Sequence, residues 1–299
     1  MTFYEAVKAV VMKSYKIEWG PYSLELGNKT RIMGIVNVTP DSFSDGGFFF
    51  DPDAAVAQGE KLAKDGADIL DIGGESTRPF SAEVSAEEEI RRVVPVIKRL
   101  SGRVSIPISI DTTKAVVARH AIEAGASMIN DTSALRFDDE LPDVAVKYGV
   151  PVILMHMKGT PKDMQISPEY DDLFTDIREF LLDAVKRAVI RGIDRSKIIV
   201  DPGIGFGKTI EHNLLLIKHI DKFTDLDVPF LIGPSRKAFI RKILKNKAGE
   251  EPKPHDPAVE TGTQAAVAAA VLAGVHIVRV HDVANTVSTV KIIDAIKKA

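Results

Sequence analysis

Short runs of apolar residues recur along the chain, and each is followed by a longer segment with apolar residues three or four positions apart. The runs are rich in valine, isoleucine and leucine, which is typical of parallel strands that are covered on both faces. We expect eight such strands, at 32–36, 68–72, 107–110, 128–130, 152–155, 198–200, 230–232 and 277–280. This alternation of strand and helix predicts an α/β protein with a parallel sheet.

The segments between the expected strands carry helix start signals, such as Ser85 followed by Glu88 in a capping box. We expect helices to begin near Asp53, Ser85, Lys114, Asp138, Glu169, Ile210, Arg236 and Ala284. Eight strand–helix units in a chain of 299 residues favour a single (β/α)₈ TIM barrel, spanning residues 31–299. A doubly wound open sheet is the main rival.

Four segments stand apart from this repeating pattern. Residues 1–30 form an N-terminal extension, for which we expect a hairpin around Gly20 and Pro21 that caps the bottom of the barrel. Residues 246–257, with three prolines and alternating charges, are interpreted as a surface insertion between the seventh and eighth strands. Residues 260–263 are expected to form a turn before the last helix, and the acidic run 87–89 to lie on a solvated helix face.

Composition narrows the class of protein. Lys and Arg total 39 against 42 Asp and Glu, so a net charge of -3 gives no reason to expect a nucleic-acid or membrane partner. The absence of cysteine excludes disulfides, thiolate zinc ligands and cysteine nucleophiles, and it suits a reducing compartment. The N-terminus lacks an apolar signal segment and no stretch approaches a membrane span, so we expect a soluble, cytoplasmic protein.

Polar residues follow every expected strand, at the end of a barrel where active sites lie. Any one of them, such as Asp111, could merely form a turn or cap a helix. The convergence of the set is not explained in that way, because Asn, Asp and Lys offer complementary donors and acceptors for a flat heterocycle. Ser235, Arg236, Arg279 and His281 add hydroxyl and cationic groups on the last two strands, where barrels commonly bind phosphate.

Two other motifs carry less weight. Residues 202–209 nearly match a Walker A loop, but Pro202 replaces its first glycine, and a proline has no N–H for the phosphate nest. The seven histidines lack zinc-ligand spacing, and His156 is interpreted as a packing and hydrogen-bonding residue.

The motifs at successive strand ends resemble those of the dihydropteroate synthase family. They are NVTPDSFSDGG at 37–47, GGESTRP at 73–79, DPGIGFGK at 201–208, GPSRK at 233–237 and RVHD at 279–282. The resemblance implies condensation of p-aminobenzoate with 6-hydroxymethyl-7,8-dihydropterin diphosphate, giving 7,8-dihydropteroate and pyrophosphate in folate biosynthesis. It further implies an SN1-like reaction, Mg²⁺ as cofactor, sulfonamides as inhibitors and a homodimer.

The resemblance also assigns roles to residues at the strand ends. It implies catalytic roles for Asp41, Asp111 and Lys237, and pterin binding by Asp111, Asn130, Met155, Asp201, Gly233 and Lys237. The p-aminobenzoate pocket and its loops would comprise Pro40, Phe43, Thr77, Arg78 and Ser235. The diphosphate would be bound by Asn37, Arg236, Arg279 and His281, with Asn37 also as the metal ligand.

Two alternatives remain open. A methyltetrahydrofolate:corrinoid methyltransferase shares the pterin-binding barrel but has no diphosphate to bind, so the cationic groups after the last two strands argue against it. A non-catalytic pterin-binding paralogue would keep the ring pocket and lose loop or anion-binding residues. Because Asn37, Asp41, Arg78 and Lys237 are all present, this second alternative ranks last.

Overall fold

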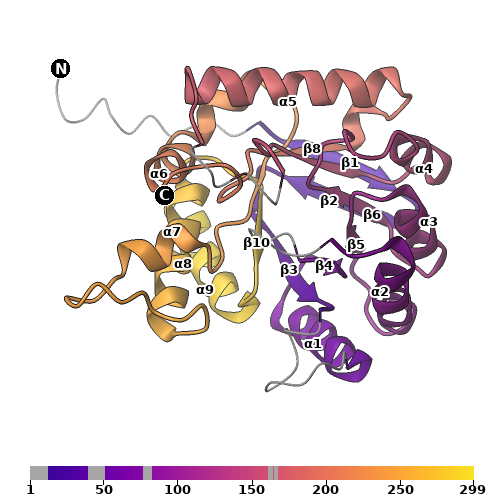
Figure 1. Ribbon diagram of the computed structural model, residues 1–299, viewed down its shortest axis with the longest axis horizontal. Helices are drawn as coiled ribbons and strands as arrows, with labels where there is room; N and C mark the ends of the chain where they lie inside the picture. The colour runs from indigo at the N-terminus through magenta and orange to yellow at the C-terminus, as the bar shows by residue number, and fades with distance from the viewer. Residues whose placement is uncertain (1–12, 40–50, 77–82, 161–163, 165–167) are drawn as a thin grey trace.

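The computed structural model describes residues 13–39, 51–76, 83–160, 164 and 168–299 (Figure 1). Eight parallel strands form one sheet in the order β8-β7-β6-β5-β4-β3-β10-β9. A parallel bridge between Val200 and Phe230, with the Val200 N–H donating to the Pro229 carbonyl (3.0 Å), joins the two ends of this sheet. The sheet thus closes on itself, and the expected (β/α)₈ barrel is confirmed.

The barrel strands lie at or next to the expected positions. They are β3 (Arg31–Asn37), β4 (Ile69–Gly73), β5 (Ile108–Asp111), β6 (Met128–Asp131), β7 (Val152–Met155), β8 (Ile198–Asp201), β9 (Leu231–Ile232) and β10 (Ile277–Val280). Helices surround them on the outside (Figure 1). In the described part of the chain these are α1 (Pro52–Asp65), α2 (Ala86–Ser101), α3 (Ala115–Glu123), α4 (Leu141–Tyr148), α5 (Leu173–Ile190), α6 (Ile210–Lys218), α7 (Ala238–Ile243), α8 (Pro257–Leu272) and α9 (Val283–Ile296), with short 3₁₀ helices η3 (Arg195–Lys197) and η4 (Ile220–Leu226).

Capping residues set the helix starts. Ser85 caps α2 as expected, its hydroxyl accepting from the Glu88 N–H (3.3 Å). Helix α5 begins at Leu173 and not near Glu169, because the Asp172 carboxylate accepts from the Thr175 N–H (2.7 Å) and so satisfies the first turn there.

The turn expected at residues 260–263 is wrong, because these residues lie inside α8. The helix begins earlier, where Pro257 occupies a first-turn position and needs no N–H partner. Gly262 fits the helix for a packing reason: a Cβ there would lie 2.6 Å from Ile240 Cγ2 on α7. The glycine therefore marks the close approach of two helices.

The interpretation of residues 87–89 as a solvated face is also wrong for Glu89, which is fully buried on α2. Its carboxylate accepts from Lys114 Nζ (2.7 Å), which also donates to Glu75 (2.6 Å). Glu75 in turn accepts from the Val84 N–H (2.9 Å). A buried carboxylate needs such a partner, and the contact ties α2, the start of α3 and the segment after β4 together.

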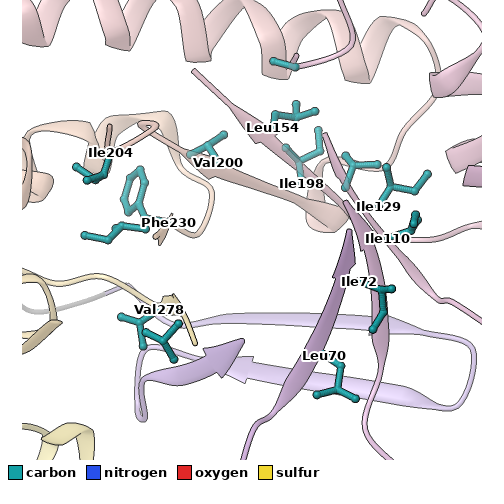
Figure 2. Packing of buried hydrophobic residues seen from close by; sticks show 14 of the residues in the cluster. Leu70, Ile72, Ile110, Ile129, Leu154, Ile198, Val200, Ile204, Phe230 and Val278 are labelled. Carbon is teal, nitrogen blue, oxygen red and sulfur yellow. The ribbon is translucent and has the colours of Figure 1, made fainter. Parts of the chain in front are cut away.

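Two apolar layers flank the barrel wall. Outward-facing strand residues, including Leu70, Ile72, Ile129 and Val278, pack under the helices (Figure 2). Inward-facing residues near the strand starts form a second layer of Met33, Ile69, Met128, Ile153, Ile199, Leu231 and Ile277. Apolar residues of the same strand thus alternate between the two layers, as the pleat requires.

The strands β1 (Tyr15–Trp19) and β2 (Tyr22–Leu26) form an antiparallel hairpin at the starts of the barrel strands. Ile17, Trp19, Leu24 and Leu26 belong to the same buried cluster as the inner layer of the barrel. This end of the barrel is therefore filled with apolar side chains.

Residues 246–256 connect α7 to α8 and are mostly exposed. Their turn is ordered by Asn246, whose carboxamide oxygen accepts from the Ala248 N–H (2.9 Å) and the Glu250 N–H (3.0 Å). None of the described helices is long and apolar enough to cross a lipid bilayer.

Candidate active site

The pleat of each strand determines which side chains line the site. In β4, β6, β8 and β10, the inward positions after the apolar layer are Asp71, Asn130, Asp201 and Arg279. Each lies two residues beyond an inward Ile or Met, namely Ile69, Met128, Ile199 and Ile277. The same period of two therefore builds an apolar layer at one end of the barrel and a polar layer at the other.

Arg279 is the centre of a largely buried charged cluster. Its Nε donates to Asp71 Oδ2 (2.6 Å) and its Nη2 donates to Asp111 Oδ2 (2.7 Å). The Asn130 carboxamide also donates to Asp71 Oδ2 (3.0 Å). Asp71 is fully buried, and its Oδ1 has no hydrogen-bond partner among the described residues. The cluster brings the predicted Asp111, Asn130 and Arg279 together around one aspartate that sequence reasoning missed.

Two carboxylates share one guanidinium in this cluster, and the pKa values of Asp111 and Arg279 are shifted by burial and by the neighbouring charges. Burial raises the pKa of Asp111 to about 7: the loss of solvation outweighs the attraction of Arg279, and the nearby Asp71 adds to the effect. Burial alone would lower the pKa of Arg279, but Asp71 and Asp111 outweigh it and raise this pKa. The guanidinium therefore stays charged.

Asp201 ends β8 and begins the tight turn of residues 201–208. Its Oδ1 accepts from the Gly203 N–H (2.7 Å), and burial raises its pKa to about 6 despite this hydrogen bond and the nearby Lys237. Gly203 has φ +74°, and a Cβ there would lie 1.9 Å from the His156 carbonyl oxygen. Only glycine fits this position.

An apolar wall lies beside these polar groups. Met155, Met157, Met164 and Phe206 form a separate buried cluster. The ammonium group of Lys237 lies over the Phe206 ring, 3.9 Å from its centroid. Lys237 directly precedes α7, so its side chain is directed by the end of β9 and the start of this helix.

Ser235 and His281 contact each other across the last two strand ends. The His281 N–H donates to the Ser235 hydroxyl (3.2 Å), and this hydroxyl lies 2.9 Å from His281 Nδ1. Since the hydroxyl accepts the first bond, its own proton is available for Nδ1, which leaves the ring proton of a neutral His281 on Nε2. Gly233 adds no such contact, and a Cβ there would meet Arg279 Cβ at an ordinary 3.7 Å.

Arg236 lies at the same turn but contacts a different region. Its backbone has φ +58°, and its N–H donates to Thr263 Oγ1 (3.2 Å) on α8. The guanidinium Nη1 lies 3.0 Å from His255 Nδ1, and Nε lies 3.7 Å from Glu260. Of the four residues expected to bind diphosphate, Arg236 is the one directed towards the 246–257 insertion.

Asn37, the last residue of β3, is the predicted metal ligand. Its partly exposed side chain makes no hydrogen bond to another described residue, so its amide oxygen is available as a hard donor. No cluster of three or more His, Asp or Glu that could hold a metal occurs in the described part of the chain. One oxygen donor fits Mg²⁺, which keeps several waters and commonly takes its other ligands from substrate phosphates.

The remaining predicted residues, Pro40, Asp41, Phe43, Thr77 and Arg78, lie outside the described residues. Sequence reasoning missed Asp71 and the pairing of Lys208 with His156, whose Nδ1 lies 2.9 Å from Lys208 Nζ. A carboxylate at an inward position of a strand that is otherwise apolar was the available signal for Asp71. The expectation that His156 packs and forms a hydrogen bond is correct.

A barrel with carboxylates, a carboxamide and an arginine gathered at its C-terminal face has the arrangement of an enzyme suited to a polar heterocycle. The family model described as "Pterin binding enzyme" matches residues 33–281. The dihydropteroate synthase of Synechocystis sp. is 44% identical over 277 residues, which is 93% of each chain. These matches show that the chain belongs to the pterin-binding enzyme family, as a member of its dihydropteroate synthases.

Solved structures agree. A Yersinia pestis dihydropteroate synthase in complex with a sulfonamide drug has a TM-score of 0.86 at 41% identity, covering 95% of this chain and 99% of the other. A Xanthomonas albilineans dihydropteroate synthase with 4-aminobenzoic acid also has a TM-score of 0.86, at 43% identity, covering 96% of this chain and all (100%) of the other.

Proposed function

We propose that this chain condenses p-aminobenzoate with 6-hydroxymethyl-7,8-dihydropterin diphosphate, giving 7,8-dihydropteroate and pyrophosphate. The C–O bond to the diphosphate breaks with its electron pair on the leaving group, and the amine nitrogen then bonds to the pterin methylene carbon and loses a proton. The observation that carries this proposal is the buried cluster of Asp71, Asp111, Asn130 and Arg279 at the active-site face.

The pterin ring is proposed to bind between this cluster and the Met155 wall. Asp111 and Asp201 would accept from ring N–H groups, Asn130 would contribute its amide, and Lys237 would donate to ring acceptors. The carboxylates would also stabilise the cationic pterin of an SN1-like path, because a fixed charge in a water-poor site requires no reorganisation. Gly233 is proposed to line the pocket beside Arg279, whose Cβ would lie 3.7 Å from a Cβ at Gly233.

The leaving diphosphate is proposed to bind at the adjacent cationic groups. Arg279 uses Nε and Nη2 for its aspartates, and its Nη1 has no partner among the described residues. His281 Nε2–H is a second donor, and Arg236 a third if it leaves His255. Asn37 would hold Mg²⁺, which when bound offsets the charge that develops on the leaving group.

The p-aminobenzoate pocket is proposed to include Ser235, two residues before Lys237 in the chain, together with Pro40, Phe43, Thr77 and Arg78. Asp41 is proposed to act with Asp111 and Lys237 in catalysis. The neighbour that contains 4-aminobenzoic acid and the one that contains a sulfonamide support this assignment by analogy. Sulfonamides are therefore expected to inhibit the enzyme.

The test is product formation by the purified protein. Dihydropterin diphosphate, Mg²⁺ and p-aminobenzoate should give dihydropteroate and pyrophosphate in equal amounts, and Asn37→Ala should raise the Mg²⁺ concentration needed for half-maximal rate by about tenfold. A folded protein that binds the pterin and forms no dihydropteroate would instead be a non-catalytic paralogue. Methyl transfer to a corrinoid protein would support the methyltransferase alternative.

We also propose an oligomeric state for this chain. Exposed apolar residues on α6, α7 and α8 and directly after α7, namely Leu214, Ile243, Leu272 and Leu244, support a homodimer through this side of the barrel. Sedimentation equilibrium should give twice the chain mass of 32.6 kDa. The cytoplasmic location stays a prediction.

A further inference from the structure

Lys208 is an unusual residue in this barrel, because its side chain is almost fully buried (3% exposed). Its Nζ donates to the Phe206 carbonyl oxygen (2.9 Å) and lies 2.9 Å from His156 Nδ1. No carboxylate of a described residue lies within ion-pair distance of this amine. Burying a lysine amine without an anionic partner costs free energy. The burial of Lys208 beside the Phe206 carbonyl therefore calls for a structural or functional reason.

His156 provides the second contact and is itself buried (4% exposed). Burial, reinforced by Lys208, lowers the pKa of His156 well below its usual value, so the ring is neutral and Nδ1 can accept. The His156 N–H donates to the Asp201 carbonyl oxygen (2.8 Å). Lys208 therefore joins the 202–208 turn to the ends of both β7 and β8.

The same turn contacts the side chain of Lys237 at two points. The Phe206 ring lies under its ammonium group at 3.9 Å. A Cβ on Gly205 would lie 2.9 Å from Lys237 Cδ, so the lysine chain runs along the 205–206 backbone. The Gly205 N–H donates to Asn213 (2.6 Å), which fixes the turn from the α6 side.

We propose that Lys208 is a positioning residue for the pterin pocket, acting through Phe206 to hold the ammonium group of Lys237 in place. The path consists of one hydrogen bond from Lys208 Nζ to the Phe206 carbonyl and one ring–cation contact from Phe206 to Lys237. The inference rests on the proposed function, because it assumes that Lys237 binds the pterin. It assigns a role to a residue that never touches the substrate.

A double-mutant cycle on the full-length protein tests this path. Lys208→Met keeps an unbranched side chain as far as Cε and removes the amine with its donors, and Lys237→Met removes the ammonium group. With Lys237 present, Lys208→Met should weaken binding of dihydropterin diphosphate by about tenfold; in the Lys237→Met background the loss should be below about twofold. Isothermal titration calorimetry in the presence of Mg²⁺ measures the loss of affinity in each background.

Asp294→Asn is the matched control. Asp294 is buried at the opposite end of the barrel, where it accepts from the Thr30 N–H (3.0 Å) and hydroxyl (3.0 Å). The variant should lower the urea midpoint and leave pterin affinity unchanged. Equal losses from Lys208→Met in both backgrounds, or unchanged affinity, would overturn the proposal.

If Lys208→Met does not fold, Phe206→Leu tests the second contact alone. It removes the ring under Lys237 and retains the buried amine, and its loss of affinity should be smaller in the Lys237→Met background, where only its part in the apolar wall beside the pterin remains. Additive losses would overturn the proposal. The parent protein provides a separate check: if it does not bind dihydropterin diphosphate, the proposed function is wrong, whereas binding by the parent with additive losses in the cycle contradicts the positioning role alone.

Discussion

The two ends of the barrel are built from the same strands with opposite chemistry. At the strand starts, Met33, Ile69 and Ile277 meet the apolar side chains of the β1–β2 hairpin. Two residues further along β4 and β10, the inward positions are Asp71 and Arg279, which form an ion pair. The first end contributes hydrophobic stability, and the second retains buried charges that a purely structural core would not need.

This contrast predicts that stability and catalysis can be changed separately. Apolar burial at the strand starts stabilises the fold in proportion to the area removed from water. The charged end contributes little net stability even when intact, because desolvation offsets the attraction between its members. Removing one charged residue of this cluster nevertheless lowers the unfolding free energy, because its partners remain buried without a counter-charge.

The largest effect is expected from Arg279→Met. The change leaves Asp71 and Asp111 without their shared cation, so we expect a loss of about 3–5 kcal/mol in unfolding free energy. Turnover should fall by about 10³-fold, because the proposed donor to the leaving diphosphate is also removed. Urea unfolding and dihydropteroate formation measure the two losses.

The control for this variant is Arg103→Met, which removes a solvent-exposed ion pair with Glu60 (2.9 Å). It should change the unfolding free energy by less than about 1 kcal/mol. If the two arginine variants lose similar stability, the charged cluster is not a distinct part of the barrel, and the contrast between its ends fails.

At the other end, Leu26→Ala should cost about 3 kcal/mol of unfolding free energy. Leu26 is 1% exposed and packs in the apolar cluster at the strand starts, so its removal leaves a cavity. The turnover number should stay within about twofold of the parent value, because the pterin pocket is at the opposite end. A large loss of turnover in protein that remains folded would contradict the separation of stability from catalysis.

The next largest effect is a pH dependence confined to the charged end. Burial raises the pKa of Asp201 to about 6 and that of Asp111 to about 7, from an ordinary 3.8. These two carboxyl groups therefore bind protons more tightly in the folded protein than in the unfolded chain. Their protonation stabilises the fold fully below pH 3.8, and this stabilisation is lost as pH rises to about 7. Pterin affinity should change in the opposite sense, because ionised carboxylates accept ring N–H groups.

Urea midpoints and pterin affinity measured from pH 4 to pH 8 check both trends. Asp201→Asn is the control, and it should flatten the part of each curve that lies below about pH 6. The two trends would be contradicted if stability rose, or affinity fell, across this window in the parent protein.

Most of the barrel could be predicted because β-branched runs and caps are local signals. All eight strands overlap their expected positions, and Ser85 caps α2 as expected. The sequence predicts the start of α5 too early and a turn at residues 260–263, where the contact of Gly262 with Ile240 fits the chain to a helix. Long-range packing decides such positions.

The candidate site is likewise only partly predictable from the sequence. Asp111, Asn130 and Asp201 lie at or next to the last residues of their strands, and this placement is visible in the sequence. The sharing of Arg279 between two aspartates is not, since these partners are 208 and 168 residues away along the chain. The pairing of β10 with β3 in the sheet is what brings Arg279 within reach of β4 and β5.

The smallest effect is expected at the insertion, which belongs to neither end. His255→Ala removes a contact with Arg236 Nη1 (3.0 Å) at an exposed position, so the unfolding free energy should change by less than about 0.5 kcal/mol. The KM for dihydropterin diphosphate should change by less than about twofold, because Thr263, and not His255, accepts the Arg236 backbone N–H.

Thr263→Val is the matched comparison for this contact. Thr263 is fully buried, and its replacement leaves the N–H of Arg236 without an acceptor while the backbone there has φ +58°. This variant should lose about 1–3 kcal/mol and raise the same KM more than His255→Ala does. If His255→Ala has the larger effect on KM, the insertion takes part in anion binding, and the active-site face extends beyond the strand ends to α7 and α8.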